Sequence, residues 1–316
     1  MVEDGVQRLA YIGFGEAGMA FAAGLRGGVA YDRKTDLAET AQAKRDDYAA
    51  RGVTGADSSD AAVAGATLIL SLVTADQALA AARAAAAAIT PGALFCDLNS
   101  VAPDTKRAAA AIIMAAGGRY VDVAVMAPVD PAGRAVPLLI AGPHAAAARV
   151  ALATAGFTRA RVLDGPVGAA SSVKMIRSVM VKGLEALTTE CFLAAEAAGV
   201  LDEVAASLDA SWPGTDWAAK ADYNLDRMMV HGLRRAAEME EVVKTLDVLG
   251  TGSAMTRGTV ARQRAVGALA LVPAPGLDAK LRAVGAGHAH GPESRESAAS
   301  AAAMSHAPER EQERYA

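Results

Sequence analysis

The sequence predicts an α/β protein, a doubly wound parallel sheet followed by an all-α carboxyl-terminal domain. Up to about residue 165, short apolar runs of strand length alternate with amphipathic or alanine-rich helical segments, which is typical of a parallel sheet covered by helices. From about residue 169 to 270 we find no convincing strand pattern. The hydrophobic content of 53% includes only 4% aromatic residues, which favours closely packed helices around a modest sheet.

The predicted strands are short apolar runs separated by turn residues. In chain order they are 9–12, 28–31, 67–72, 93–98, 120–125, 138–141 and 161–163. Between them, residues 57–60, 74–76 and 103–104 supply helix-capping side chains and first-turn acids. Right-handed helical crossovers between such strands would place a ligand crevice at the carboxyl ends of the strands.

We expect the first domain to span residues 1–165 and a helical domain for substrate binding and dimerisation to span 166–272. Its first helix is predicted over about 169–198, before a glycine C-cap at Gly199. Further helices are expected around 201–211, 216–229 and 233–249. Residues 273–316 are low in large apolar residues and rich in small and charged ones, which predicts a mostly disordered tail.

The first strand runs directly into a glycine-rich turn, GFGEAG, with glycines at positions 13, 15 and 18. This G-x-G-x-x-G pattern indicates a Rossmann-type dinucleotide site when a strand precedes it, a helix follows it and an acid lies about 20 residues downstream. Asp32 meets the last requirement. Gly13 would allow the sharp turn, Gly15 would let the backbone approach a pyrophosphate, and Gly18 would let helix and strand pack closely.

The acidic residue leaves the choice between the two nicotinamide dinucleotides open. Asp32 would accept hydrogen bonds from the adenosine ribose and repel a 2′-phosphate, which favours NAD. The adjacent Arg33 could instead bind that phosphate and favour NADP.

Charge and cysteine content exclude several classes of function. The net charge of −4 gives no electrostatic reason to expect nucleic acid or an anionic membrane. Two cysteines do not make a disulfide framework, which indicates a reducing cytoplasm. His288 and His290 form an H-x-H pair without nearby Cys or acidic ligands, so we expect no metal site.

Together with three later segments, the glycine turn resembles the amino-terminal fingerprint of the β-hydroxyacid dehydrogenase superfamily, which includes 3-hydroxyisobutyrate and 6-phosphogluconate dehydrogenases. The segment 67–73, TLILSLV, is similar to the family's fourth strand, and DLNSVAPDT at 97–105 is similar to its D-x-S-T-x-x-P loop. GPVGAASSVKMIRS resembles the segment with the family's catalytic lysine, which implies that role for Lys174. The resemblance covers about residues 8–270.

Three departures indicate a divergent bacterial branch with a phosphogluconate-dehydrogenase-like carboxyl-terminal domain. The family's D-A-P-V-S-G-G loop is replaced by DVAVMAP at 122–128, and a glycine four residues before the lysine by Ala170. The asparagine one helical turn after the lysine is replaced by Ser178. With these changes, the resemblance implies neither 3-hydroxyisobutyrate nor 6-phosphogluconate as the substrate.

The resemblance implies an NAD(P)-dependent oxidoreductase that transfers a hydride between the cofactor and a small β-hydroxy acid or its semialdehyde or keto form. Lys174 would be the general acid/base, and Ser100, Asn99 and Ser178 would complete the catalytic set. The expected cofactor-binding residues are Gly13, Phe14, Gly15, Glu16, Ala17, Gly18, Met19, Asp32, Arg33, Leu72, Val73, Thr74 and Asn99. Candidate substrate-binding residues are Met126, Lys182, His231, Arg234 and Arg235.

Helical periodicity adds that Lys174, Ser178, Lys182 and Glu185 share one face, which could line a cleft between the domains. Two alternatives are an imine reductase-like enzyme, which usually lacks the lysine, and a catalytically inactive dinucleotide-binding protein. By analogy with relatives that pair through the helical domain, we expect a homodimer.

Overall fold

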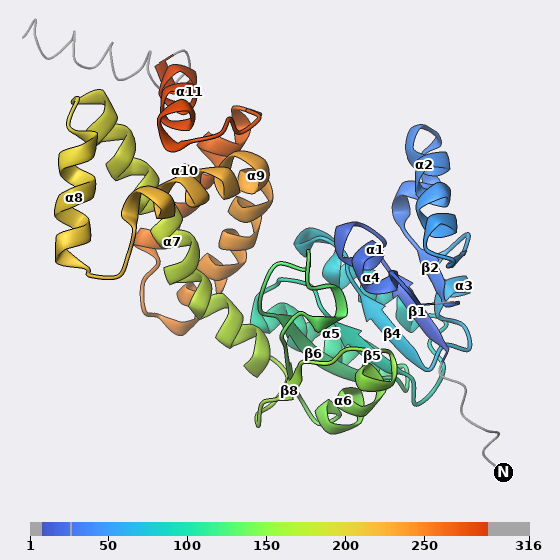
Figure 1. Ribbon diagram of the computed structural model, residues 1–316. Helices are drawn as coiled ribbons and strands as arrows, with labels where there is room; N and C mark the ends of the chain where they lie inside the picture. Colours follow the sequence, from blue (N-terminus) through green and yellow to red (C-terminus); the bar gives the residue numbers. More distant parts are fainter. Residues whose placement is uncertain (1–7, 26, 290–316) are drawn as a thin grey trace, which may run out of the picture. The chain divides into compact units, whose positions relative to one another are not determined.

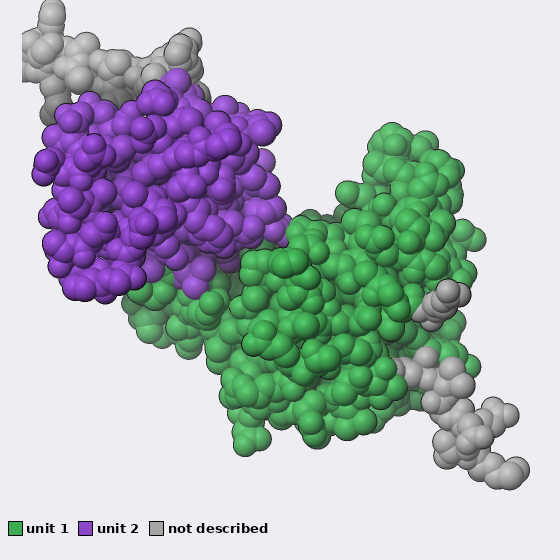
Figure 2. Space-filling model, in the orientation of Figure 1, with its two compact units in different colours: residues 1–180, 237–257 green, residues 181–236, 258–316 purple. Residues whose placement is uncertain are grey.

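The computed structural model describes residues 8–25 and 27–289. The chain divides into two compact units, residues 1–180 with 237–257 and residues 181–236 with 258–316 (Figure 2). This division differs from the predicted domain boundaries, because residues 166–180 and 237–257 fold with the sheet. Backbone contacts explain the difference: the N–H groups of Gly168 and Ser171 bind Asp122 on the sheet, and Glu241 binds the N–H of Ala102.

The first unit contains one eight-stranded sheet in the order β3-β2-β1-β4-β5-β6-β7-β8 (Figure 1). Its strands are β1 (Leu9–Ile12), β2 (Val29–Tyr31), β3 (Thr54–Gly55), β4 (Leu68–Ser71), β5 (Leu94–Asp97), β6 (Arg119–Val125), β7 (Leu138–Ala141) and β8 (Ala160–Val162). The two-residue β3 was not among the predicted strands, since it is too short to show a pattern. The predicted fold class is confirmed: a mostly parallel, Rossmann-like sheet with flanking helices precedes a helical region.

One pair of strands corrects the expectation of a fully parallel sheet. β6 and β7 are antiparallel, with Asp122 opposite Ala141 and Val125 opposite Leu138. The connection between them, residues 126–137, contains only the short 3₁₀ turn Gly133–Ala135. Parallel strands are usually joined by a crossover helix, and this connection contains none; it returns the chain beside β6 in the antiparallel direction.

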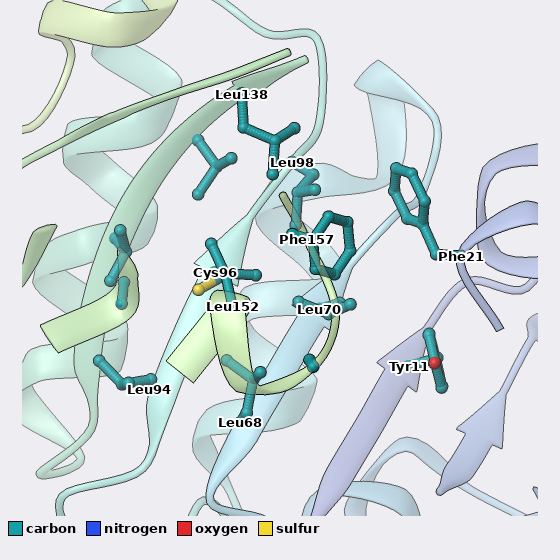
Figure 3. Close-up of a cluster of buried hydrophobic side chains, with 14 of the residues drawn as sticks. Tyr11, Phe21, Leu68, Leu70, Leu94, Cys96, Leu98, Leu138, Leu152 and Phe157 are labelled. Carbon is teal, nitrogen blue, oxygen red and sulfur yellow. The ribbon is translucent and has the colours of Figure 1, made fainter. Parts of the chain in front are cut away.

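Apolar side chains on both faces of the sheet are covered by helices. Along β4, Leu68 and Leu70 belong to one core cluster and Ile69 to the other, as alternation in a buried strand requires. Figure 3 shows the first cluster, in which Phe21 and Leu152 come from helices. The helices that contribute to the two clusters are α1 (Glu16–Ala22), α2 (Ala38–Ala50), α3 (Ser59–Val63), α4 (Ala78–Ala86), α5 (Pro103–Ala115) and α6 (Ala145–Thr154).

The remaining helices are α7 (Ala169–Ala197), α8 (Leu201–Ser211), α9 (Trp217–Leu249), α10 (Ala254–Ala268) and α11 (Leu277–Ala289). α9 is one helix where the sequence predicts two. Gly232, at the predicted interruption, lies inside the helix because α10 passes very close: a Cβ there would lie 2.4 Å from the carbonyl oxygen of Gln263. This glycine serves helix packing instead of ending a helix.

The structure also differs from the predicted tail at residues 277–289, which form α11. Leu281 and Val284 are buried in the core of the second unit with Phe192 and Met228. The ammonium of Lys280 lies 2.7 Å from Asp222 and 3.0 Å from Asp226. Residues 290–316 lie outside the described part of the chain. Among the described helices, none is long and apolar enough to cross a membrane.

Candidate active site

The glycine turn joins β1 to α1 and lies against the end of β4. Gly13 has a φ of +86°, a left-handed conformation that favours glycine, and its N–H donates to the carbonyl of Tyr31 at 2.9 Å. A Cβ on Gly13 would lie only 2.7 Å from the carbonyl oxygen of Leu72. A Cβ on Gly18 would lie 3.1 Å from the carbonyl oxygen of Gly13, so this position needs close packing. Both glycines therefore shape the turn itself.

Gly15 differs from these two glycines because the space that a side chain would fill is open. A Cβ on Gly15 would meet no atom within 4 Å, and its φ of −84° is open to any residue. The fold therefore does not require glycine here. An open approach to the backbone at the start of α1 is what a pyrophosphate needs, so this turn fits a dinucleotide.

The carboxylate of Asp32, just after β2, holds the turn from the other side. Its Oδ2 accepts the N–H of Phe14 at 2.8 Å, and its Oδ1 accepts the N–H of Lys34 at 3.0 Å. Each oxygen can accept a further hydrogen bond, and the residue is partly exposed. Arg33 is exposed beside it. The predicted ribose-binding acid thus lies at the glycine turn with its orientation fixed by two backbone amides.

Sequence reasoning missed a lysine that supports the same turn. The buried Lys44 of α2 donates from Nζ to the carbonyl of Phe14 at 2.8 Å and pairs with Asp47 at 2.6 Å. Its only sequence signal is its position in the buried stripe of α2, where Ala41, Lys44 and Tyr48 recur at spacings of three and four.

Asn99 connects the ends of two neighbouring strands. Its Oδ1 accepts the N–H of Val73 at 2.7 Å, and its Nδ2 donates to the hydroxyl of Ser71 at 2.9 Å. Its own N–H donates to Asp97 at 2.9 Å. Val73, a predicted cofactor-facing residue after β4, is therefore held by this buried amide, while the N–H of its neighbour Leu72 donates to the carbonyl of Ile12 in β1 at 2.7 Å.

Lys174 and Ser100 form the pair that the sequence places at the reaction centre. The Nζ of Lys174, in the second turn of α7, lies 2.5 Å from the Oγ of Ser100, in the loop after β5. Both side chains are only partly buried. The hydroxyl of Ser178 donates to the backbone carbonyl of Lys174 at 2.9 Å. Lys174 and Ser100 are 74 positions apart in the sequence, and they meet at the carboxyl edge of the sheet.

Buried charges beneath this pair were not predicted as site residues. Lys106 of α5, with no exposed surface, binds Asp97 at 2.9 Å and lies 3.6 Å from Asp122. Tyr120 donates its hydroxyl to Asp97 at 2.7 Å, and burial, followed by the charge of Asp97, raises the Tyr120 pKa well above its usual range. Lys106 occupies the buried stripe of α5 with Ala109, Ala110 and Ile113, and a lysine in such a stripe is the signal that could have found it.

The other candidate substrate residues lie in different parts of the chain. Met126 follows β6 and donates its N–H to Pro137 at 2.9 Å in the first unit. Lys182 and Arg235 are in the second unit, where the partly buried Arg235 forms an ion pair with the buried carboxylate of Glu185. His231 is partly exposed and Arg234 is exposed, also in the second unit. The first unit therefore brings together the cofactor residues, Asn99, Ser100, Lys174, Ser178 and Met126, but not these four.

Among the described residues, no group of three or more His, Cys, Asp and Glu could hold a metal ion. His290 and the side chain of His288 lie outside what the structure describes.

Two family models match the chain. Residues 8–162 match the NAD binding domain of 6-phosphogluconate dehydrogenase, and residues 195–266 match a domain of unknown function, DUF1932. No protein of curated function matches the chain.

Several solved structures are similar to this chain over most of its length. A conserved hypothetical protein from Sinorhizobium meliloti 1021 is 36% identical, with a TM-score of 0.71 over 90% of this chain and 98% of that one. MTH1747, a conserved protein of unknown function described as similar in structure to 3-hydroxyacid dehydrogenases, is 27% identical, with a TM-score of 0.62 over 82% of this chain and 99% of that one.

At the level of fold alone, a Mycobacterium tuberculosis 3-hydroxyisobutyrate dehydrogenase with L-serine is 18% identical, with a TM-score of 0.66 over 88% of this chain and 99% of that one. The expected cofactor, NAD or NADP, agrees with the family of the first domain. The chain belongs to the β-hydroxyacid dehydrogenase superfamily, in a branch that joins the NAD-binding domain of 6-phosphogluconate dehydrogenase to a DUF1932 domain.

Proposed function

We propose that this protein is an NAD(P)-dependent oxidoreductase that interconverts a small β-hydroxy acid and its semialdehyde or keto form, with Lys174 as the general acid/base. The observation that carries the proposal is the 2.5 Å contact between Lys174 Nζ and Ser100 Oγ. This contact lies at the carboxyl edge of a sheet whose first turn fits a dinucleotide. General acids and bases act within such hydrogen-bonding distances of the group they serve.

Different residues of the first unit would bind different parts of the cofactor. The open backbone at Gly15 would receive the pyrophosphate, Asp32 would accept the adenosine ribose hydroxyls, and Leu72 to Thr74 would border the dinucleotide. The remaining turn residues Phe14, Glu16, Ala17, Met19 and Arg33 belong to the same proposed binding surface. When bound, the nicotinamide supplies or accepts the hydride.

Lys174 would move the proton. In the reducing direction its ammonium donates a proton from Nζ to the carbonyl oxygen of the substrate, and in the oxidising direction the neutral amine takes the proton back from the hydroxyl. The hydroxyl of Ser100, which is held against Nζ, would orient the lysine and contact the same substrate oxygen. Ser178 supports this geometry through the backbone carbonyl of Lys174, and Asn99 holds the backbone of Val73 beside the proposed cofactor surface.

Several side chains are candidates for binding the substrate carboxylate. Met126 follows β6 in the first unit, at the same sheet edge as Ser100. Lys182, His231, Arg234 and Arg235 stay candidates for the carboxylate by their charge. Among these, Arg235 already pairs through its guanidinium with Glu185.

The two alternative functions predict different outcomes in one assay. An imine reductase-like enzyme would reduce cyclic imines and not hydroxy acids or their carbonyl forms, and the lysine at the centre argues against it. An inactive dinucleotide-binding protein would bind NADH or NADPH and turn over nothing. The Lys174–Ser100 contact favours an active acid/base pair over both.

The decisive experiment is a panel of small β-hydroxy acids with NAD and NADP, and of their carbonyl forms and of cyclic imines with NADH and NADPH, followed at the absorbance of the reduced nicotinamide. We expect Lys174→Ala to lower kcat by about 10²- to 10⁴-fold while the affinity for the reduced cofactor stays unchanged. Arg177→Ala, which removes an exposed charge from the same helix, is the matched control. Full turnover by Lys174→Ala would refute the assigned role.

We further propose a homodimer and a cytoplasmic location. In the second unit Leu187, Val230 and Leu233 are each more than half exposed, which leaves apolar surface for a second copy. Cys96 and Cys191 are both free thiols, as a reducing compartment requires. Light scattering coupled to size-exclusion chromatography would test the dimer.

A further inference from the structure

We propose that Lys106 is a positioning residue that sets the contact between Lys174 and Ser100, by holding together the two carboxylates to which their separate elements are attached. The inference rests on the proposed function only in taking Lys174 and Ser100 as the reacting pair. Lys106 belongs to α5, and its ammonium binds Asp97 and lies near Asp122.

The first carboxylate controls the loop that carries Ser100. The Nζ of Lys106 donates both to the backbone carbonyl of Asp97, at 2.6 Å, and to its Oδ1, at 2.9 Å. That same Oδ1 accepts the N–H of Asn99, the residue immediately before Ser100. Tyr120 occupies the other oxygen of Asp97. The path from Lys106 to Ser100 is therefore two hydrogen bonds and one peptide link.

The second carboxylate controls the helix that carries Lys174. Oδ2 of Asp122 accepts the N–H groups of Gly168 and Ser171, both at 3.1 Å, at the beginning of α7. A carboxylate at this position also interacts favourably with the helix dipole. Its Oδ1 has no hydrogen-bond partner, and the ammonium of Lys106 lies 3.6 Å away. Lys106 thus compensates the charge of the group on which the start of α7 rests.

All three charged side chains are almost completely buried, so the cluster has a desolvation cost of several kcal/mol per ion. Apolar residues of similar volume often stabilise a core equally well or better, so stability alone does not account for the cluster. A hydrogen-bonded ionic cluster adds geometric specificity, because its hydrogen bonds are made in one arrangement of β5, β6 and α7. That arrangement is the one in which Lys174 and Ser100 meet.

The test measures the reactivity of Lys174 without using turnover. The folded protein is treated with an amine-reactive N-hydroxysuccinimide ester, and the labelling rate of each lysine is read by peptide mass spectrometry. Ser100→Ala defines the effect of losing the contact, and we expect it to speed labelling of Lys174 by roughly 2- to 10-fold, as loss of one hydrogen bond implies. We expect Lys106→Met to speed it equally, and Ser100→Ala with Lys106→Met to add nothing further.

Lys280→Met is the matched control. Lys280 is also a buried lysine between two aspartates, but it lies in the second unit. Its loss should leave the labelling of Lys174 unchanged. If Lys106→Met does not fold, the charge-balanced variant Lys106→Met with Asp122→Asn keeps an amide oxygen for the N–H groups of α7, and fast labelling of Lys174 is again expected.

A folded variant without Lys106 that labels Lys174 at the wild-type rate would overturn the inference. That result is independent of the proposed function, which fails instead if Lys174→Ala retains turnover. In an active enzyme, the positioning role also predicts that Lys106→Met lowers kcat while the affinity for NADH stays at the wild-type value. Equal loss of both would indicate a general structural role and contradict positioning.

Discussion

The Oδ2 of Asp32 accepts the N–H of Phe14 at 2.8 Å, so the acid that follows β2 is bonded directly to the glycine turn that follows β1. Lys44 holds the carbonyl of the same residue at 2.8 Å. Both polar groups that Phe14 contributes to the main chain are therefore fixed by side chains from other elements. The turn is preorganised for its ligand, which lowers the ordering cost of binding.

Asp32→Ala should weaken the binding of NADH by roughly 10- to 100-fold. Hydrogen bonds to a charged group contribute about 1.5–3 kcal/mol, and this variant loses those to the ribose and to the Phe14 amide. Titration of the variant with NADH, followed by the fluorescence of the reduced nicotinamide, measures the change. Asp57→Ala, which removes an exposed carboxylate of the same unit, is the control and should bind NADH normally.

The same position decides the preference between the two cofactors. Asp32→Ser removes the charge that repels a 2′-phosphate and leaves the adjacent Arg33 in place. The ratio of NADPH to NADH affinity should therefore rise. An unchanged ratio would mean that neither residue contacts the adenosine ribose.

Substitution by alanine should affect two glycines of the turn differently: it should lower stability at Gly13 and cofactor affinity at Gly15. Gly13→Ala must strain the backbone at φ +86° and push against the Leu72 carbonyl, so we expect a loss of at least about 1–3 kcal/mol in unfolding free energy. Gly15→Ala meets no atom of the protein, so its stability should stay within about 0.5 kcal/mol of wild type. Its cofactor affinity should nevertheless fall, because the added methyl group occupies the space proposed for the pyrophosphate.

Denaturant unfolding and NADH titration on both variants test this pair together. A Gly15→Ala protein with both normal stability and normal affinity would show that this turn does not approach the dinucleotide.

The carboxyl edge of the sheet can be predicted from the sequence, because short local patterns mark where each strand ends. A buried parallel strand is a short apolar run, and Gly13 and Asp32 mark where such runs end. Lys174 and Ser100 were both identified through their own segments, although no local pattern states that they touch. What could not be predicted depends on contacts between distant segments.

Three features illustrate that dependence. The position of Lys106 in the apolar stripe of α5 indicates burial, but its partners Asp97 and Asp122 come from two other elements. Gly232 looks like a helix interruption until α10 is packed against it. α11 has too few large apolar residues for its sequence to predict a packed helix. Its contacts through Leu281, Val284 and the ion pairs of Lys280 hold it in the second unit.

Arg235→Ala should destabilise the second unit by about 3–5 kcal/mol, since it leaves the buried carboxylate of Glu185 without its cation. Gln263 donates to the same carboxylate at 2.8 Å and does not replace the lost charge. Arg234→Ala, its exposed neighbour, should change stability by less than about 0.5 kcal/mol. Normal stability of Arg235→Ala combined with a raised KM would instead favour a direct role in binding the substrate.

Cys96 should make the protein less stable at alkaline pH. Its thiol is fully buried, and burial raises its pKa to about 12. In the unfolded chain the thiol ionises near pH 8.5, so between about pH 8.5 and 12 the unfolded state binds fewer protons than the folded state. The contribution of Cys96 to stability is therefore complete below pH 8.5 and should fall by about 1.4 kcal/mol per pH unit through this window.

Cys96→Val removes this titration and keeps an apolar side chain in the core. The difference in unfolding free energy between wild type and Cys96→Val, measured by denaturant unfolding from pH 7.5 to 10.5, isolates the thiol from the buried tyrosines, which titrate in both proteins. We expect that difference to move steadily against the wild type above about pH 8.5, while a thiol reagent labels only the partly exposed Cys191 in the native protein. Rapid native labelling of Cys96, or a difference that does not vary with pH, would contradict its place in the core.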